Sequence, residues 1–233
     1  MLYVTDAAFQ SSHDRHRRLA GIGAVTAKLA ATRGYAVCVN YHRDGDAAEQ
    51  VVDDIRSKGG QAAAIQADIG SEAAVLELYW QIDSALGKVS ALVNNAATLE
   101  PKMRLDARDA SRMERVFTVN VLGSMLCARE AVKRMSMRHG GRGGAIVNVS
   151  SGAAKYGSPG EYVDYAAKKG AIKTFTVGLA AKPEGVDRVK TLVPMQRGGQ
   201  PEEVANAILW LLSEEASYLP GQSLTCPAAA KLK

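Results

Sequence analysis

Short apolar runs alternate with longer segments of helical periodicity along most of this chain, and this alternation restricts the fold more than any other feature. Five of the runs are rich in Ala, Val and Ile with few polar residues between them, which is typical of parallel strands buried on both faces. These runs are Leu2–Val4, Ala36–Asn40, Ala62–Gln66, Ala91–Asn94 and Ala145–Val149. The pattern predicts an α/β fold, a doubly wound parallel sheet of the Rossmann type with helices on both faces.

The segments between these runs carry apolar residues at helical spacing, which predicts crossover helices between the parallel strands. Gly34 and Gly59 are expected to end the first two helices, and Pro201 to begin the last one. The predicted helices are Ala24–Arg33, Ala47–Lys58, Ser71–Leu86, Ala110–Met137, Tyr162–Ala181 and Pro201–Leu212. Because no linker, internal repeat or low-complexity tract divides the chain, residues 1–233 are expected to form a single domain.

Charge and cysteine content argue against several classes of function. The net charge is +5, but the basic residues are spread along the chain and only 6% of residues are aromatic, so we expect no nucleic-acid partner. Cys38, Cys127 and Cys226 have no metal-ligand spacing, which predicts neither a disulfide framework nor a metal site. No apolar stretch reaches bilayer length and no signal-peptide pattern is present, so we expect a cytoplasmic protein without membrane association.

Tyr165 and Lys169 stand four residues apart in a predicted helix and therefore share one face of it. A free tyrosine has a pKa of about 10, and a neighbouring ammonium group favours the phenolate and lowers that pKa. Such a tyrosine is suited to proton transfer near neutral pH. Taken alone, the pair also fits a solvated tyrosine and lysine on an amphipathic helix.

Polar residues elsewhere in the chain give this pair a context. Ser150 and Ser151 end the fifth predicted strand, at the carboxyl edge where open α/β sheets bind ligands. The sequence Asn-Asn-Ala-Ala at residues 94–97 follows the fourth strand, and Asn120 lies on the next helix. In this order the motifs resemble the short-chain dehydrogenase/reductase family, which has NNAG, a helical Asn, a strand-end Ser and YxxxK. The resemblance covers most of residues 24–181 and part of residues 197–221.

The resemblance implies four catalytic residues. Tyr165 is the general acid/base, which exchanges a proton with the carbonyl or alcohol oxygen of the substrate. Lys169 lowers the pKa of Tyr165 and holds the nicotinamide ribose. Ser151 donates a hydrogen bond to the same substrate oxygen, and Asn120 holds a water on a relay to Lys169.

The choice between the two strand-end serines rests on the family pattern, which favours Ser151 and leaves Ser150 as the alternative. Ser151 precedes Tyr165 by 14 positions, one more than the commonest spacing in the family. We expect a turn at Gly157–Gly160 to take up the extra residue.

The end of the second strand predicts the cofactor. A carboxylate there accepts a hydrogen bond from the ribose 2′-hydroxyl of NAD, whereas a cation pairs with the 2′-phosphate of NADP. Here Tyr41, His42 and Arg43 precede the first acid, Asp44. Because the Arg43 guanidinium can pair with a phosphate, NADP is the expected cofactor, with NAD as the alternative. In the simpler interpretation, Arg43 is a solvated loop residue.

Further cofactor contacts are implied by the resemblance. Asp68, which follows the third strand, matches the residue beside the adenine, although it also fits a cap for the helix that begins near Ser71. The implied contacts are Gly21, Ile22, Gly23, Tyr41, Arg43, Asp68, Ile69, Asn94, Ala96, Tyr165 and Lys169.

Three segments depart from the family pattern. The phosphate turn lacks its first glycine and holds 15 residues, 6–20, where the family has about four. The substrate-lid region at residues 181–196 is shortened. In one alignment residues 189–193 form a degenerate sixth strand; in the other, which we favour, strand and lid are both absent. The third departure is the C-terminal segment 226–233, which replaces an expected Asp-Gly-Gly region.

Together the motifs predict an NADP-dependent oxidoreductase that acts on a carbonyl or secondary alcohol of a small molecule. The alternative is a catalytically silent member of the fold that serves as a binding or assembly module, because its phosphate turn and lid are damaged. The resemblance also implies a homo-tetramer or homodimer built partly from the helices at residues 110–137 and 162–181. Substrate identity is not specified by these motifs.

Overall fold

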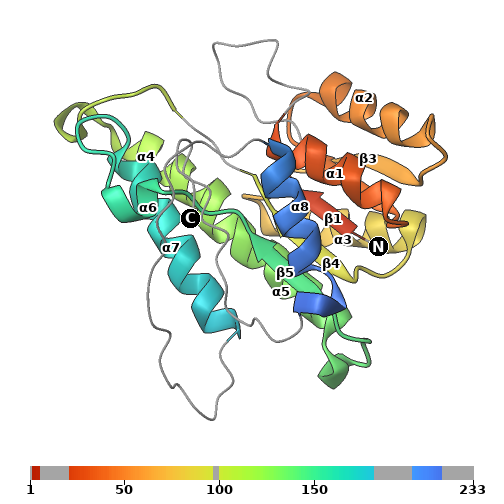
Figure 1. Cartoon of the computed structure of the whole chain (residues 1–233). Coiled ribbons are helices and arrows are strands. Elements are labelled where there is room, and N and C mark those ends of the chain that lie inside the picture. The colour runs from red at the N-terminus through yellow and green to blue at the C-terminus, as the bar shows by residue number, and fades with distance from the viewer. Residues whose placement is uncertain (1, 6–20, 97–99, 181–200, 217–233) are drawn as a thin grey trace.

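A parallel sheet forms the centre of the molecule. The computed structural model describes residues 2–5, 21–96, 100–180 and 201–216 (Figure 1). Within these residues the sheet has five strands, all parallel, in the order β3-β2-β1-β4-β5. The strands are β1 (Leu2–Thr5), β2 (Val37–Tyr41), β3 (Ala62–Gln66), β4 (Ala91–Asn94) and β5 (Ala145–Asn148). The predicted doubly wound α/β fold is confirmed.

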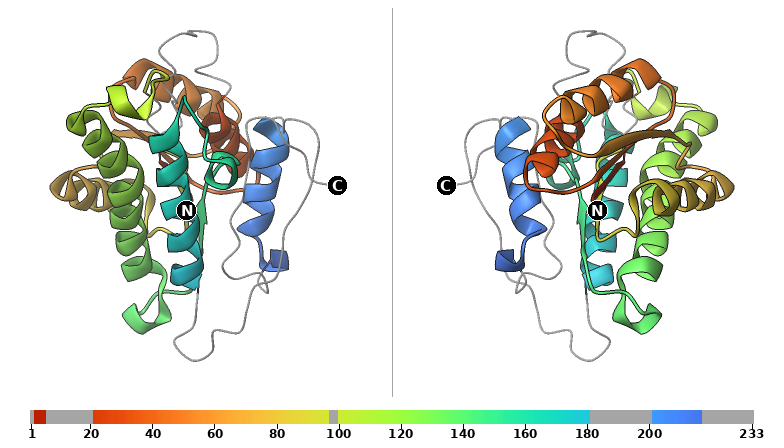
Figure 2. Two further views of the ribbon diagram at one scale, coloured as in Figure 1. Left: turned by 90° about the vertical axis from the view of Figure 1, so that its left-hand side faces the viewer. Right: turned by 90° about the vertical axis from the view of Figure 1, so that its right-hand side faces the viewer.

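Helices cover both faces of this sheet, as the two side views in Figure 2 show. One layer packs on the sheet through α1 (Ile22–Thr32), α2 (Gly45–Arg56) and α8 (Pro201–Leu211). The other layer holds α3 (Glu72–Leu86), α4 (Ala110–Phe117), α5 (Gly123–Met135) and α7 (Val163–Ala180). Shorter pieces are η2 (Leu105–Ala107), η4 (Met137–His139), α6 (Ala153–Tyr156) and η5 (Glu214–Ala216).

Strand β2 shows why the apolar runs of the sequence do not alternate with polar residues. Val37 and Val39 pack into the apolar cluster under α1, α2 and α8, whereas Cys38 between them packs into the cluster under α3 and α5. Successive side chains of a strand point to opposite faces. Since both faces of β2 are covered by helices, these three positions carry apolar residues, and all three side chains are fully buried.

The predicted helix Ala110–Met137 is wrong in one respect, because the structure divides it. A π-helical turn, η3 (Thr118–Leu122), separates α4 from α5. Gly123 follows this turn, and a Cβ atom there would lie 2.8 Å from the carbonyl oxygen of Ile69. The wider turn therefore accompanies a close approach between this helix and the segment after β3. Periodicity alone does not reveal such a contact.

Some expectations fall outside the described residues. These are the atypical phosphate turn at 6–20, the lid region at 181–196 and the C-terminal segment 226–233. For this reason the proposal that residues 1–233 form one domain stays a prediction.

Candidate active site

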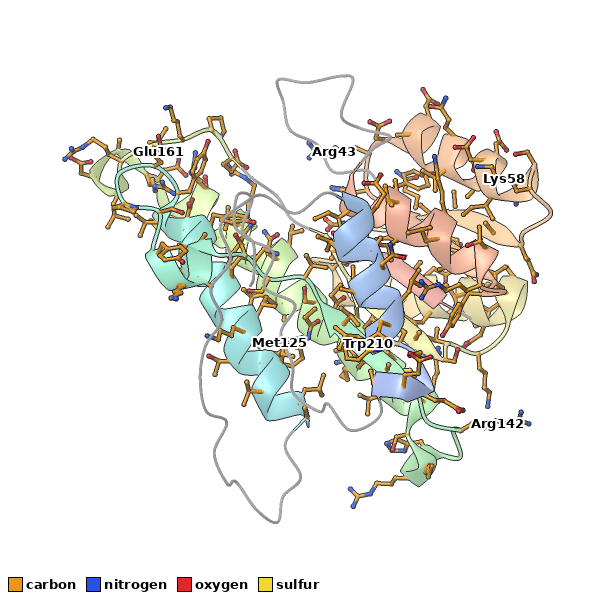
Figure 3. The ribbon with its side chains drawn as sticks, viewed as in Figure 1. Arg43, Lys58, Met125, Arg142, Glu161 and Trp210 are labelled. Atoms are coloured by element: carbon orange, nitrogen blue, oxygen red, sulfur yellow. The ribbon has the colours of Figure 1, made fainter. Side chains whose placement is uncertain are left out.

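The strand order places the candidate site at the carboxyl edge of the sheet. The order reverses between β1 and β4, and ligands of doubly wound sheets bind in the crevice at that point. Thr5 pairs in register with Asn94, which in turn pairs with Asn148, so the carboxyl ends of β1, β4 and β5 are level. In Figure 3, Arg43, just after β2, lies at this upper edge, and Arg142, which precedes β5, lies at the opposite end.

Tyr165 and Lys169 come together in the first turns of α7, as their spacing predicts. The Lys169 Nζ atom lies 5.8 Å from the centre of the Tyr165 ring. The same Nζ atom donates a hydrogen bond of 2.6 Å to the carbonyl oxygen of Val149, at the end of β5. The Lys169 residue is only 4% exposed, and its burial lowers the pKa of the amine to about 8. Lys169 therefore remains mostly protonated at neutral pH beside the Tyr165 ring.

The two strand-end serines have different surroundings. Ser150 donates a hydrogen bond from its hydroxyl to the carbonyl oxygen of Lys169, at 3.1 Å. The hydroxyl of Ser151 accepts a hydrogen bond of 3.2 Å from the backbone N–H of Ala153, where the short helix α6 begins. Both serines are buried. Ser150 thus connects β5 to α7, while Ser151 stands at the start of the segment that leads towards Tyr165.

The segment between Ser151 and Tyr165 contains the predicted turn and one element that was not predicted. Gly157 and Gly160 have φ values of 77° and 76°, in the left-handed region that favours glycine, and Ser158 has a φ of 47°. These residues form the expected turn. The helix α6 precedes it, and its four residues are too few for periodicity to identify.

Asn120 lies inside the π-helical turn η3, which packs against α7. Its side chain is 2% exposed and donates a hydrogen bond of 2.7 Å to the carbonyl oxygen of Val116. The Ser124 hydroxyl donates in turn to the carbonyl oxygen of Asn120. Single π turns are frequent at functional sites, and this one brings a helical asparagine against the helix that carries Tyr165.

Gly21, Ile22 and Gly23 form the start of α1. Gly21 is the N-cap residue in an extended conformation, and Gly23 is buried. The first N–H groups of an α-helix have no partner within the helix and, with the helix dipole, form a site for anions. Residues 21–23 therefore have the geometry of a helix N-terminus of the kind at which anions bind. Residues 6–20, which precede them, lie outside the described residues.

Tyr41 at the end of β2 and the residues that follow it have different surroundings. Tyr41 ends the strand half-buried, with its ring packed against Gly45, and Arg43 is exposed. Asp44 accepts a hydrogen bond of 3.2 Å from the backbone N–H of Ala47 and thereby caps α2. One oxygen of the first acid after β2 thus caps a helix, and the exposed guanidinium of Arg43 lies next to it in the sequence.

Asp68 and Ile69 lie between β3 and α3. Asp68 accepts a hydrogen bond of 2.9 Å from the backbone N–H of Gly70, and its other oxygen lies 3.9 Å from the imidazole Nε2 of His42. Ser71 caps α3, so the interpretation of Asp68 as the cap of that helix is wrong. Ile69 is 4% exposed. Asp68 therefore connects the ends of β2 and β3 and has no bond to the helix.

Asn94 connects β4 to α5 and to β5 through hydrogen bonds of its side chain. Its amide nitrogen donates to the carbonyl oxygen of Ser124 at 3.1 Å and to the amide oxygen of Asn148 at 2.8 Å. Asn148 donates to the Thr176 hydroxyl at 3.0 Å, which extends the chain of bonds from β4 through β5 to α7. Ala96, two positions beyond the strand, is 7% exposed. The structure thus commits the Asn94 amide nitrogen to internal bonds.

A buried ion cluster beside Tyr165 was not predicted from the sequence. Asp164 pairs with both Arg108 and Arg112, and the Arg112 Nε lies 3.2 Å from a carboxylate oxygen of Asp164. All three side chains are at most 6% exposed. Burial alone would raise the pKa of Asp164, but hydrogen bonds from Arg108, from the Tyr165 backbone and from Arg112 hold it below its usual value.

This cluster also holds the loop before α4. Arg108 donates to the carbonyl oxygens of Met103 and Glu161, and Arg112 donates to that of Pro101 at 2.7 Å. The backbone N–H of Met103 donates a hydrogen bond of 3.0 Å to the Glu161 carbonyl oxygen as well. The cluster therefore ties the loop after β4 to the beginning of α7. The only sequence signal was the spacing of the two arginines, which are four residues apart.

Lys168 is the second lysine beside Tyr165, and sequence analysis did not single it out. It is fully buried, and its Nζ atom lies 4.6 Å from the centre of the Tyr165 ring.

Within the described residues, no group of three or more His, Cys, Asp or Glu could hold a metal ion. None of the described helices is long and apolar enough to cross a membrane.

Comparison with protein families gives two matches. A family model described as short chain dehydrogenase matches residues 19–194. A second, described as enoyl-(acyl carrier protein) reductase, matches residues 178–227. The first match contains every candidate site residue named above.

Individual relatives extend over most of the chain. The uncharacterized oxidoreductase YgfF of Escherichia coli is 48% identical over 227 residues, which cover 86% of this chain and 92% of that protein. The 3-oxoacyl-[acyl-carrier-protein] reductase FabG of Staphylococcus epidermidis is 30% identical over 228 residues, covering 88% and 92%. A short chain dehydrogenase from Burkholderia cenocepacia, solved in complex with NADP, superposes with a TM-score of 0.78 at 25% identity, covering 97% of this chain and 96% of that chain.

Proposed function

Because the chain belongs to the short-chain dehydrogenase/reductase family of oxidoreductases, we propose that it transfers a hydride between NADP(H) and a carbonyl or secondary alcohol of a small molecule. The observation that carries the proposal is the placement of Tyr165 next to the buried, protonated amine of Lys169. This arrangement suits a tyrosine that gives and takes a proton near neutral pH.

In the reductive direction Tyr165 donates its hydroxyl proton to the carbonyl oxygen as that oxygen gains negative charge. The chemistry that the bound cofactor supplies is hydride transfer to the carbonyl carbon. The ammonium of Lys169 stabilises the phenolate that remains, and the hydrogen bond to Val149 fixes its position. In the oxidative direction the Tyr165 phenolate accepts the proton of the alcohol.

Ser151 is proposed to donate a hydrogen bond to the same substrate oxygen. Its surroundings support this role, because Ser150 already uses its hydroxyl proton in the bond to the Lys169 carbonyl oxygen. The Ser151 hydroxyl accepts from the Ala153 N–H and so keeps its own proton for a substrate. Asn120, in the turn packed against α7, is proposed to hold a water on a relay to Lys169.

The residues of the cofactor side fit NADP. The start of α1 at residues 21–23 would hold the pyrophosphate, with Asp68 and Ile69 beside the adenine. Tyr41 and the exposed Arg43 would hold the adenosine ribose and its 2′-phosphate. The capping bond of Asp44 supports NADP over NAD, because no other acid directly follows β2. The NADP complex of the Burkholderia relative agrees with this proposal.

Replacement of Arg43 by Ala is expected to weaken NADPH binding about tenfold or more and to leave NADH binding nearly unchanged. The reason is the loss of a charge-assisted hydrogen bond to the 2′-phosphate, worth about 1.5–3 kcal/mol. Fluorescence titration with each nucleotide measures both affinities. Arg142→Ala is the matched control, because Arg142 is also exposed but lies at the opposite end of the sheet (Figure 3). Equal losses for NADPH and NADH would contradict the assignment of Arg43.

The experiment that tests the activity is a panel of carbonyl compounds assayed with NADPH. The 3-oxoacyl reductase relative makes a 3-oxoacyl thioester one useful member of the panel, together with small ketones, sugars and steroids. Consumption of NADPH with any member supports the proposal. If NADPH fails to bind even at high micromolar concentration, the chain is instead a silent binding or assembly module of the same fold.

We also propose that the enzyme is a cytoplasmic homo-tetramer or homodimer. The helices α4 and α5 with the turn between them expose large apolar side chains at Phe117, Leu122 and Met125, 38–47% exposed (Figure 3 labels Met125). Exposed apolar side chains on neighbouring turns of a helix are typical of a protein interface. The buried free thiols of Cys38 and Cys127 suit a reducing compartment.

A Leu122→Glu/Met125→Glu variant is expected to elute as a monomer, because two carboxylates would be buried in the interface between copies. Size-exclusion chromatography with light scattering measures the mass. The control is Trp80→Glu on α3, a side chain that is 63% exposed but belongs to another helix. An unchanged mass for the double variant would place the interface elsewhere.

A further inference from the structure

Lys168 lies nearer to the Tyr165 ring than the lysine of the YxxxK motif does, and the proposed mechanism does not use it. We propose that Lys168 is a positioning residue that sets the charge beside the Tyr165 ring and thereby the pH range in which Tyr165 exchanges a proton. The inference rests on the proposed function, since it concerns the same tyrosine.

The geometry places the Tyr165 ring close to two amines. The Lys168 Nζ atom is 4.6 Å from the ring centre and the Lys169 Nζ atom 5.8 Å from it. Consecutive residues of a helix point about 100° apart, so the two lysines reach the ring from different directions. Lys169 donates its bond to the Val149 carbonyl oxygen, whereas Lys168 is buried with no exposed surface. A change of charge on Lys168 is therefore felt at the ring with little screening by water.

The acid best placed to compensate Lys168 is already engaged. Asp164 precedes Lys168 by one helical turn and so shares its face of α7. Its two carboxylate oxygens pair with Arg108 and Arg112, which approach from the loop before α4 and from α4 itself. Two guanidinium groups thus share the single negative charge of Asp164, which opposes the loss of the Lys168 proton only in part.

The charged groups that act on Lys168 come from α7 and from the loop after β4. Burial lowers its pKa most, and the neighbouring Lys169 lowers it further, whereas Asp164 and Glu100 oppose the change. The result is a pKa of about 6. Burial and the charge of Lys169 together give the two adjacent lysines different states: near neutral pH Lys169 is mostly an ammonium and Lys168 mostly an uncharged amine.

The consequence is a switch in charge on the acid side of neutrality. As the pH falls through about 6, Lys168 gains a proton and a second cation appears beside the Tyr165 ring. A cation favours the phenolate that proton donation leaves behind, so Tyr165 becomes a stronger acid in this range. The rate of reduction is therefore expected to rise as the pH falls through this step. Lys169, with its pKa of about 8, cannot produce a step at this pH.

Two variants fix the two charge states. Lys168→Met keeps a long side chain with no charge, and Lys168→Arg carries a positive charge at every pH. The ionisation of Tyr165 is measured by the ultraviolet absorbance of its phenolate, as the difference between each protein and its Tyr165→Phe counterpart. We expect the Arg variant to ionise Tyr165 about one pH unit or more below the Met variant. Lys173→Met and Lys173→Arg, at an exposed position of α7, are the matched controls and should show no difference.

The wild-type chain provides a second measurement, which does not depend on the folding of the Arg variant. Its Lys168 amine, followed by nuclear magnetic resonance, should titrate near pH 6, and that signal should be absent from Lys168→Met. The step in the rate of reduction should likewise be absent from Lys168→Met and present in both Lys173 variants.

The two proposals fail in different ways. If no carbonyl substrate is reduced, the proposed function fails, while the absorbance and resonance titrations still decide the role of Lys168. Equal midpoints for Tyr165 in the Met and Arg variants would overturn the role of Lys168. So would a wild-type Lys168 that stays protonated at neutral pH, or a step near pH 6 that persists in Lys168→Met.

Discussion

Tyr165→Phe is expected to lower kcat by a factor of about 10²–10⁴ while leaving the affinity for NADPH nearly unchanged. The substitution removes one hydroxyl group and with it the proton that the proposed mechanism delivers to the carbonyl oxygen; general acid catalysis contributes rate factors of this size. The ring itself stays, and with it the contacts of Lys168 and Lys169. Steady-state kinetics with the best substrate of the carbonyl panel and fluorescence titration with NADPH measure the two quantities.

The control for this variant is Tyr156→Phe, on the neighbouring helix α6. Tyr156 is 65% exposed, so the loss of its hydroxyl should change neither quantity. Turnover retained by Tyr165→Phe would overturn the assignment of the acid. Turnover and NADPH binding lost together would show that the hydroxyl serves the cofactor site and not the proton transfer alone.

The strands were predictable because burial on both faces leaves a strong signal in the sequence. Val37, Cys38 and Val39 are all fully buried, and these three consecutive apolar residues distinguish the run from a solvated segment. The helix α1 was predictable for the same reason: Ala24, Ala27 and Ala30 form a stripe of small residues that is fully buried. The burial of apolar surface is the main driving force of folding, and the residue types of a sequence show which segments are apolar.

The π-helical turn at Asn120 was not predictable in the same way. It accompanies a close approach of Gly123 to the carbonyl oxygen of Ile69, two residues more than 50 positions apart in the sequence. Thr118 to Leu122 have the composition of an ordinary buried helix. A motif identified Asn120 as a site residue, but only the packing of η3 against α7 accounts for its placement.

The burial of the charged residues near Tyr165 could not be predicted from the sequence. Lys, Arg and Asp are mostly exposed in proteins, so Arg108, Arg112, Asp164 and Lys168 would each be expected in solvent. Their burial depends on one another, because Asp164 can be buried only with the arginines that pair with it. Mutual dependence of this kind is a property of the folded structure, and the spacing of Arg108 and Arg112 alone does not reveal it.

Asp164→Asn is expected to lower the free energy of unfolding by about 3–5 kcal/mol, because it leaves Arg108 and Arg112 buried without a counter-charge. Urea denaturation followed by circular dichroism measures the loss. The control is Asp106→Asn in the same region, where Asp106 pairs with Arg104 and is 67% exposed; such a surface pair contributes at most about 1 kcal/mol.

The stability loss of Asp164→Asn should depend on pH in a way that a general packing defect would not. The folded-state pKa of Asp164 lies below the ordinary value of 3.8, so its contribution to stability is fully present above that value and is lost as the pH falls through the folded-state pKa. The stability difference between wild type and Asp164→Asn should therefore be constant near neutral pH and shrink in strong acid. A loss no greater than that of Asp106→Asn, or one independent of pH down to the acid range, would mean that the cluster holds the loop before α4 by shape and not by charge.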